Sequence, residues 1–457
     1  MGEPGNRLGI PTRRTRGNRL PVNELRAFRL GRAAHPRARR LAARNRPRPP
    51  IHLRCGHCEA LHAPRRLRTD LSHLRNRSSR CGHRAKCHLR FERPRPVRKP
   101  VNRQPILSDY PDAVELLDAL GIVVDDTDEQ RFVGRNPCWR GRDLSGESVF
   151  VKREDRGGTR KFFRMRTVNA ELRSAVTVIE PSATSADGRI QVYPWHQSPS
   201  GSEQLAAGKL GRNVVIAVAA DIARLHSTAT SATVPAAEPL PGTYGIPSLP
   251  IAALPGLSGG QLAVWTLLHS DTEVLDTANA TVLADPPEHL RRYIHGDLRT
   301  DQILLDEHDE DAFAAIIDWE SFGSGDPARD TGTFMGNLLN IVATREIVTA
   351  KRAEAEPDWQ HEMAGAMMRS REFMVDFLTA YFDGRPGIPA ESIRDHIRRA
   401  IRFAGWHQFD RLLACSDAAP TVTPFAKALA GVGRTFLLFP DEIDEELSLT
   451  DACTHTR

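Results

Sequence analysis

The stretch that decides the fold runs from Tyr293 to Asp330 and reads YIHGDLRTDQILLDEHDEDAFAAIIDWESFGSGDPARD. It opens on His-Gly-Asp, whose carboxylate is Asp297, and continues into two short apolar segments, 303–305 and 314–317. These segments predict two strands joined by a tight acidic turn, and the second leads directly into Asp318. We therefore expect the two carboxylates to lie at neighbouring strand ends.

Two carboxylates in this arrangement suit phosphoryl transfer. One has to lie beside the attacking hydroxyl, and the other has to hold the magnesium ion that neutralises the phosphates. Asp297 is therefore the candidate catalytic residue, and Asp318 is the candidate Mg²⁺ ligand. The amide of Gln302, five residues after Asp297, is placed to help with the metal.

The stretch resembles the aminoglycoside phosphotransferase and choline kinase family, relatives of the protein kinases. That family reads His-Gly-Asp, four residues, Asn, a hydrophobic run ending in Ile-Asp-Trp-Glu, and then Gly-Asp-Pro, two residues, Asp. Residues 317–320 and 325–330 fit, whereas Gln302 replaces the metal-binding Asn and is one methylene longer. The resemblance implies an α+β, protein-kinase-like two-lobe fold, with a small antiparallel β lobe and a larger, mainly helical lobe.

Composition divides the chain near residue 104. Residues 1–100 carry 28 Lys and Arg against 5 Asp and Glu, which leaves 35 basic and 52 acidic residues in the remainder. We expect 1–104 to be a disordered Arg/Pro-rich tail, 105–195 to be the small lobe, and 196–457 to be the large lobe with helical additions at the acceptor pocket. The acidic balance of the body argues against nucleic acid as its partner.

The tail leaves three interpretations open. Its arginines could bind nucleic acid or acidic lipid, although few aromatic residues are present to stack on bases. The pairs Cys55–Cys58 and Cys81–Cys87 could chelate zinc, but the second spacing is wider than usual. We favour the third, translation from an upstream start in GC-rich DNA, because no methionine lies between Met1 and Met165.

The body begins with the pattern of a kinase small lobe. Residues 109–120 predict a short amphipathic helix. Gly134 opens a candidate phosphate-covering loop, which lacks the G-x-G-x-x-G pattern. Three strands are predicted around that loop, at 131–134, 138–140 and 147–152.

Lys152 ends the third of these strands and is the candidate partner of the α- and β-phosphates. In the family such a lysine is held by a glutamate on the next helix, for which Glu171 is the best candidate. Residues 190–195 predict an edge strand stopped by a proline. The resemblance implies that this strand runs into the hinge that pairs with adenine, so Tyr193 and Trp195 would lie beside the nucleotide.

The remaining sequence predicts a helical lobe. A long loop rich in Pro, Ala, Ser and Thr spans 227–257, and an acidic tail follows the last helix. No apolar run is long enough to span a bilayer, no signal peptide is evident, and three scattered cysteines suggest no disulfide framework, so we expect a cytoplasmic body. The predicted helices are 213–226, 261–269, 273–283, 331–344, 359–382, 392–413 and 424–439.

The expected function is ATP-dependent transfer of the γ-phosphate to a hydroxyl of a small molecule, with ATP and Mg²⁺ as cofactors. The acidic body would suit a cationic acceptor, such as an amino sugar or a choline-like amine. Two alternatives remain: a kinase acting on Ser or Thr of a peptide in a peptide-modification pathway, and a nucleotide-binding pseudokinase scaffold. Gln302 and the non-consensus glycine loop support the pseudokinase interpretation. Oligomeric state does not follow from the sequence.

Overall fold

The computed structural model describes residues 106–124, 136–154, 158–172, 175–231, 234–240, 242–352, 358–417 and 419–455. These residues belong to one compact unit, Pro100–Arg457. The predicted tail with its cysteine pairs, the predicted strand 131–134 and the loop at Gly134 lie outside the described residues. The lobe boundary at residues 195 and 196 stays a prediction.

The small lobe is a five-stranded antiparallel sheet in the order β1-β2-β3-β5-β4. Its strands are β1 (Val123–Val124), β2 (Cys138–Arg142), β3 (Ser148–Arg153), β4 (Ala183–Thr184) and β5 (Ile190–Pro194). The helix predicted at 109–120 is α1 (Pro111–Leu120), which buries Ala113 and Leu117 against Trp139 and Val151 of the sheet. The strands predicted at 138–140 and 147–152 are confirmed.

The prediction of an edge strand at 190–195 is wrong. β5 lies inside the sheet, between β3 and β4. The two-residue strand β4 pairs only with Gln191 and Val192, however, so it ends before Pro194. The missing N–H of Pro194 therefore interrupts no ladder, which is why a proline is tolerated in an interior strand.

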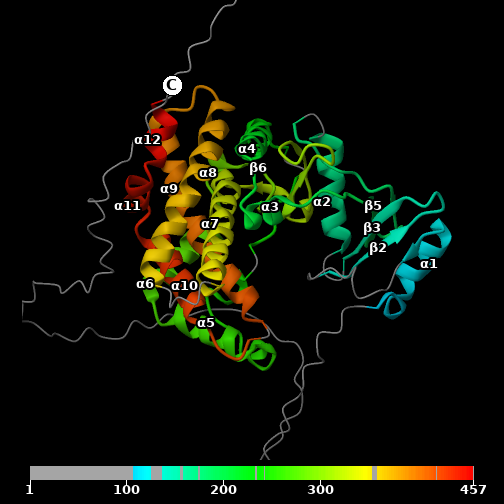
Figure 1. Ribbon diagram of the computed structural model, residues 1–457, viewed down its shortest axis with the longest axis horizontal. Helices are drawn as coiled ribbons and strands as arrows, with labels where there is room; N and C mark the ends of the chain where they lie inside the picture. The colour runs from blue at the N-terminus through cyan, green and yellow to red at the C-terminus, as the bar shows by residue number, and fades with distance from the viewer. Residues whose placement is uncertain are drawn as a thin grey trace, which may run out of the picture. The chain divides into compact units, whose positions relative to one another are not determined.

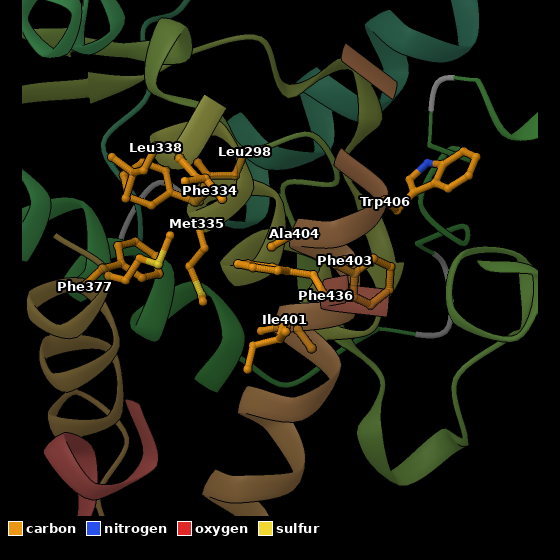
Figure 2. Packing of buried hydrophobic residues seen from close by; sticks show 14 of the residues in the cluster. Leu298, Phe334, Met335, Leu338, Phe377, Ile401, Phe403, Ala404, Trp406 and Phe436 are labelled. Carbon is orange, nitrogen blue, oxygen red and sulfur yellow. The ribbon is translucent and has the colours of Figure 1, made fainter. Parts of the chain in front are cut away.

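The large lobe is helical, and its core forms where α7 (Pro327–Arg352), α8 (Trp359–Asp383) and α9 (Ala390–Cys415) lie side by side (Figure 1). Figure 2 shows Phe334 and Met335 of α7 near Phe377 of α8, and the Phe334 and Phe377 rings stack 4.5 Å apart. Ile401 of α9 closes the same cluster. The other principal helices are α2 (Gly158–Glu171), α3 (Gly201–Ala207), α4 (Arg212–Ser227), α5 (Gly259–His269), α6 (Thr272–Ala278) and α10 (Pro424–Leu438).

Three of the predicted large-lobe segments differ from the structure. The helix predicted at 331–344 begins earlier and ends later, because it is the 26-residue helix α7 (Pro327–Arg352). The helix predicted at 273–283 ends at Ala278 and continues as a π-helical turn, Asn279–Leu283. The predicted acidic tail instead forms α11 (Pro440–Leu447) and α12 (Leu449–Thr454). Acidic residues outnumber apolar ones there, but the few apolar side chains are buried, among them Ile443, Leu447, Leu449 and Cys453. Helical spacing, rather than mean polarity, therefore decides this segment.

Two short strand pairs lie within the stretch from 292 to 325, which contains the His-Gly-Asp sequence. β6 (Arg292–Ile294) pairs with β9 (Gly323–Gly325), and β7 (Ile303–Leu305) pairs with β8 (Phe313–Ile316), both antiparallel. The strands predicted at 303–305 and 314–317 are thus confirmed. The predicted α+β fold, a small antiparallel lobe and a larger helical lobe, is confirmed as well. Among the described residues, no helix is long and apolar enough to cross a membrane.

Candidate active site

The His-Gly-Asp turn after β6 is held by backbone hydrogen bonds to one buried carboxylate. Asp330, in the first turn of α7, accepts the N–H of His295 at 2.7 Å and the N–H of Gly296 at 2.8 Å. Gly296 has a φ of +88°, and a Cβ there would lie 2.5 Å from the carbonyl oxygen of Ser321. Only glycine fits this position, so the turn leaves little freedom in where Asp297 begins.

Two buried histidines connect this turn to its surroundings. The Nε2 atom of His295 lies 3.0 Å from the carbonyl oxygen of Ile317, the residue before Asp318. His226 of α4 contacts Asp330 through Nε2 at 3.1 Å, and burial lowers the pKa of His226. His295 therefore couples the two strand ends that carry the candidate carboxylates.

Asp297 lies beside a guanidinium that the sequence analysis missed. Nη1 of Arg299 donates to Oδ2 of Asp297 at 3.1 Å, and the same guanidinium also contacts Asp301. Burial raises the pKa of Asp297, while the charge of Arg299 opposes that rise and Asp410 of α9 adds to it. A basic residue two positions after the candidate catalytic aspartate was the available sequence signal.

Lys152 of β3 reaches across to the large lobe. Its Nζ lies 2.6 Å from Oδ1 of Asp318, 2.9 Å from Oε2 of Glu320 and 3.0 Å from Oε1 of Glu154. Lys161 of α2 contacts the same two glutamates, at 3.1 Å from Glu154 and 2.9 Å from Glu320. We call these five residues the lysine cluster. Burial by itself would lower the pKa of Lys152, but its three carboxylate partners outweigh burial and hold the pKa well above its usual value.

The lysine cluster gives Lys152 partners other than Glu171. Glu171 ends α2, and its side chain lies outside the described part of the chain. Lys161 lies ten positions earlier, which corresponds to about 15 Å along a helix. The role of Glu171 therefore stays a prediction. The sequence signal for Glu154 was its position directly after β3, two residues after Lys152.

Asp318 fits a magnesium ligand. It has left-handed backbone angles, φ 66° and ψ 48°, and its side chain is 29% exposed. Its Oδ1 faces Lys152, while Oδ2 accepts no hydrogen bond from the residues that the structure describes. Those residues hold no group of three His, Cys, Asp or Glu side chains that could hold a metal. Magnesium on a nucleotide needs only one or two carboxylates, because phosphates and water supply the other oxygens.

Gln302 fits the same ion less well than the asparagine that it replaces. Its side chain is buried, and Oε1 accepts the backbone N–H of Arg299 at 3.1 Å. Its Nε2 is buried without a hydrogen-bond partner in the described structure. One lone pair of Oε1 remains for a cation, so Asp318 is the stronger candidate ligand and Gln302 a secondary one.

The other predicted nucleotide contacts lie in β5 and directly after it. Tyr193 in β5 donates its hydroxyl to Oε1 of Gln191 at 2.7 Å. The guanidinium of Arg140 stacks on the Trp195 ring, 4.5 Å from its centre. Whether either residue lies beside adenine stays a prediction, as does the role of Gly134.

Comparison with known proteins identifies the class. Residues 139–364 match the family described as "Phosphotransferase enzyme family". This region contains Lys152, Asp297, Gln302 and Asp318, so the match to that family includes the candidate site. The protein is therefore a phosphotransferase, as the resemblance implied.

Solved structures with similar folds share little sequence with this chain. An amicoumacin kinase in complex with AMP-PNP and Ca²⁺ is 14% identical, covering 74% of this chain and 95% of its own, with a TM-score of 0.46. A macrolide 2'-phosphotransferase from Brachybacterium faecium is 16% identical, covering 71% and 97%, with a TM-score of 0.37. A Plasmodium vivax ethanolamine kinase is 12% identical, covering 72% and 84%, with a TM-score of 0.40. No curated protein matches the chain.

Proposed function

We propose that this phosphotransferase transfers the γ-phosphate of ATP to a hydroxyl group of a small molecule, in the cytoplasm. The family assignment supports phosphoryl transfer. The observation that carries the proposal is the position of the two carboxylates at strand ends that His295 connects. Asp297 and Asp318 follow strands whose ends are joined through His295, and Lys152 contacts Asp318 at 2.6 Å.

The proposed roles follow from the environment of each side chain. Asp297 would accept a hydrogen bond from the acceptor hydroxyl and take its proton late in the reaction. Arg299, 3.1 Å from Asp297, would orient that carboxylate and place positive charge near the transferred group. Lys152, kept protonated by its carboxylates, would exchange one of them for the α- and β-phosphates.

A divalent cation held by Asp318, with Gln302 as a secondary ligand, would neutralise charge on the phosphates. The proteins that are similar in fold carry names of antibiotic and ethanolamine kinases, which favours a small-molecule acceptor over a peptide. We propose a cationic acceptor, because the body is acidic and Asp410 of α9 adds negative charge near Asp297.

The test combines nucleotide binding with turnover. Thermal stability of the full chain is followed as ATP is added with and without Mg²⁺, alongside Asp318→Asn. A stabilisation that requires Mg²⁺ and is lost in the variant supports the proposal, and release of ADP with a panel of amino sugars and amino alcohols then identifies the acceptor. Stabilisation without turnover on small molecules or on Ser/Thr peptides would favour the pseudokinase interpretation, for which the buried amide of Gln302 is the supporting observation.

A further inference from the structure

A cavity of about 290 Å³ lies next to the His-Gly-Asp turn but outside the lysine cluster. It is bordered by β6, β9, the beginning of α7, the middle of α9 and the segments 236–239 and 280–290. Neither Lys152 nor Asp297 nor Asp318 lines it. The cavity is therefore separate from the residues that carry the proposed phosphoryl transfer.

The walls of the cavity divide into an apolar part and a charged part. The long loop, the π-helical turn, β6 and α9 supply apolar side chains, among them Ala236, Val282, Leu283, Ile294 and Phe403. The charged part consists of three arginines and two aspartates: Arg329, Arg399, Arg402, Asp285 and Asp326. This combination is typical of a site for a molecule with an apolar body and an ionic group.

The charges in the wall are unbalanced. Asp326 already accepts a hydrogen bond from Nε of Arg399 at 2.8 Å, and Arg399 also contacts Asp395. Asp285 is 84% exposed and lies 3.7 Å from Arg291. Neither aspartate forms an ion pair with Arg329 or Arg402 in the described residues. An anion is therefore the charge that the cavity lacks.

Arg329 is the deepest of the three arginines. It is 9% exposed, its Nη2 donates to the carbonyl oxygen of Gly296, and its Nε is buried without a hydrogen-bond partner. Burial lowers the pKa of Arg329 to about 10. A buried guanidinium with an unsatisfied N–H is unfavourable unless a ligand completes its hydrogen bonds.

Arg402 has the fewest partners. It lies three residues after Arg399 on α9, its Nε is buried without a partner, and it forms no hydrogen bond or ion pair with the described part of the chain. Guanidinium groups match carboxylate and phosphate oxygens in a bidentate geometry. Arg402 is therefore the side chain on which binding at this cavity can be tested with least disturbance to the fold.

We propose that this cavity binds a small organic anion, a carboxylate or a phosphate monoester on an apolar body, through Arg402 and Arg329. The ionic group lies against the two guanidiniums, and the body lies against the apolar residues of the long loop and the π-helical turn. Because Arg329 also donates to Gly296, the bound anion contacts a residue that supports the His-Gly-Asp turn. The site exists whether or not the proposed acceptor chemistry is correct.

The test is calorimetric titration of the full chain with phenyl phosphate and with benzoate. Inorganic phosphate and benzyl alcohol present the two halves of the ligand separately. We expect at least one organic anion to bind, more tightly than either half, and Arg402→Met to weaken it by about tenfold or more. The comparison between phenyl phosphate and benzoate tells a phosphate site from a carboxylate site.

The matched control is Arg398→Met, on the same helix. Arg398 pairs with Asp441 and does not line the cavity. The Arg398→Met substitution therefore removes one positive charge from α9 without changing the site. Equal loss of binding in both variants, undiminished binding in Arg402→Met, competition by AMP-PNP, or no binding of either anion to the wild-type chain would each overturn the proposal.

A second measurement distinguishes the loss of the binding site from misfolding of the variant. Without ligand, Arg402→Met is expected to be as thermally stable as the wild type or more stable, because it removes a charge that has no partner. Addition of the binding anion should then raise the melting temperature of the wild type but not of the variant. A variant that is strongly destabilised without ligand would instead assign Arg402 a structural role.

Discussion

Two groups of cationic side chains near the His-Gly-Asp turn differ in their partners. In the lysine cluster, two lysines share three carboxylates at distances of 2.6 to 3.1 Å. In the cavity of α7 and α9, Arg329 and Arg402 form no hydrogen bond or ion pair with a carboxylate of the described residues, although both are at least partly buried. Each lysine of the first group therefore has ion-pair partners, whereas the two arginines of the second group have none in the described part of the chain.

The difference suggests how each group meets a ligand. In the proposed function, a nucleotide has to displace a carboxylate from Lys152, so its binding there would be an exchange of partners. An anion in the arginine cavity displaces no side chain, because it completes hydrogen bonds that are missing. Removing a cation should therefore have opposite consequences in the two places, and the predictions below test this contrast.

The largest effect is expected for Asp318→Asn. It removes the negative charge that contacts Lys152 and that we propose as the metal ligand, so turnover should fall by about 10³-fold or more. The fold should survive, because asparagine tolerates left-handed backbone angles and Lys152 keeps Glu154 and Glu320. Steady-state ADP release measures the loss, with exposed Asp118→Asn as the control. Turnover near that of the wild type would remove Asp318 from the mechanism.

The next effect concerns stability. Lys152→Met leaves Glu154, which is 2% exposed, with Lys161 as its only charged partner among the described residues, so the free energy of unfolding should fall by roughly 3 kcal/mol. Exposed Lys209→Met should change it by less than about 0.5 kcal/mol. Urea unfolding of both variants and of Arg402→Met compares the loss of stability at the lysine cluster with that at the arginine cavity. If Lys152→Met and Arg402→Met were equally destabilising, the two groups would not differ as argued.

A smaller effect is expected in the pH profile. Asp297 must be ionised to accept a proton, and its pKa is raised, so activity should fall on acidification at a pH above the usual aspartate pKa of about 3.9. Arg299 holds this pKa down, and Arg299→Met should therefore move the acidic limb of kcat/KM to still higher pH. The pH dependence of kcat/KM in both proteins checks the sign. If the acidic limb of kcat/KM lay at the same pH in both proteins, a group other than Asp297 would control it.

The smallest effect is expected for Gln302→Ala. Its Oε1 makes one neutral hydrogen bond to the N–H of Arg299, and only one lone pair remains for a cation. The Mg²⁺ concentration for half-maximal turnover should rise by no more than about tenfold, which corresponds to one such hydrogen bond. A rise as large as the effect of Asp318→Asn would make Gln302 a principal ligand.

Local patterns explain which parts of the fold were predictable. Helical periodicity placed α4, α8, α9 and α10 close to their observed bounds, and the apolar segments around the acidic turn placed β7 and β8. Errors arose where the local signal was weak or contrary. Pro194 suggested an edge strand because proline has no N–H to donate, but the neighbouring strand β4 is only two residues long and ends before it. The acidic residues of α11 outweighed the signal of its buried Ile443 and Leu447.

The sequence by itself determined the phosphotransferase class and the two-lobe fold, and it marked Asp297 and Asp318 as the candidate carboxylates, because these depend on motifs and on periodicities within a few residues. Only the tertiary structure decided that Lys152 contacts Asp318 and Glu320, which lie 166 and 168 residues further along the chain. It also brought Arg329 and Arg402 to one cavity. Contacts over such separations depend on how strands and helices pack. A local sequence pattern therefore does not predict which charged side chains form ion pairs.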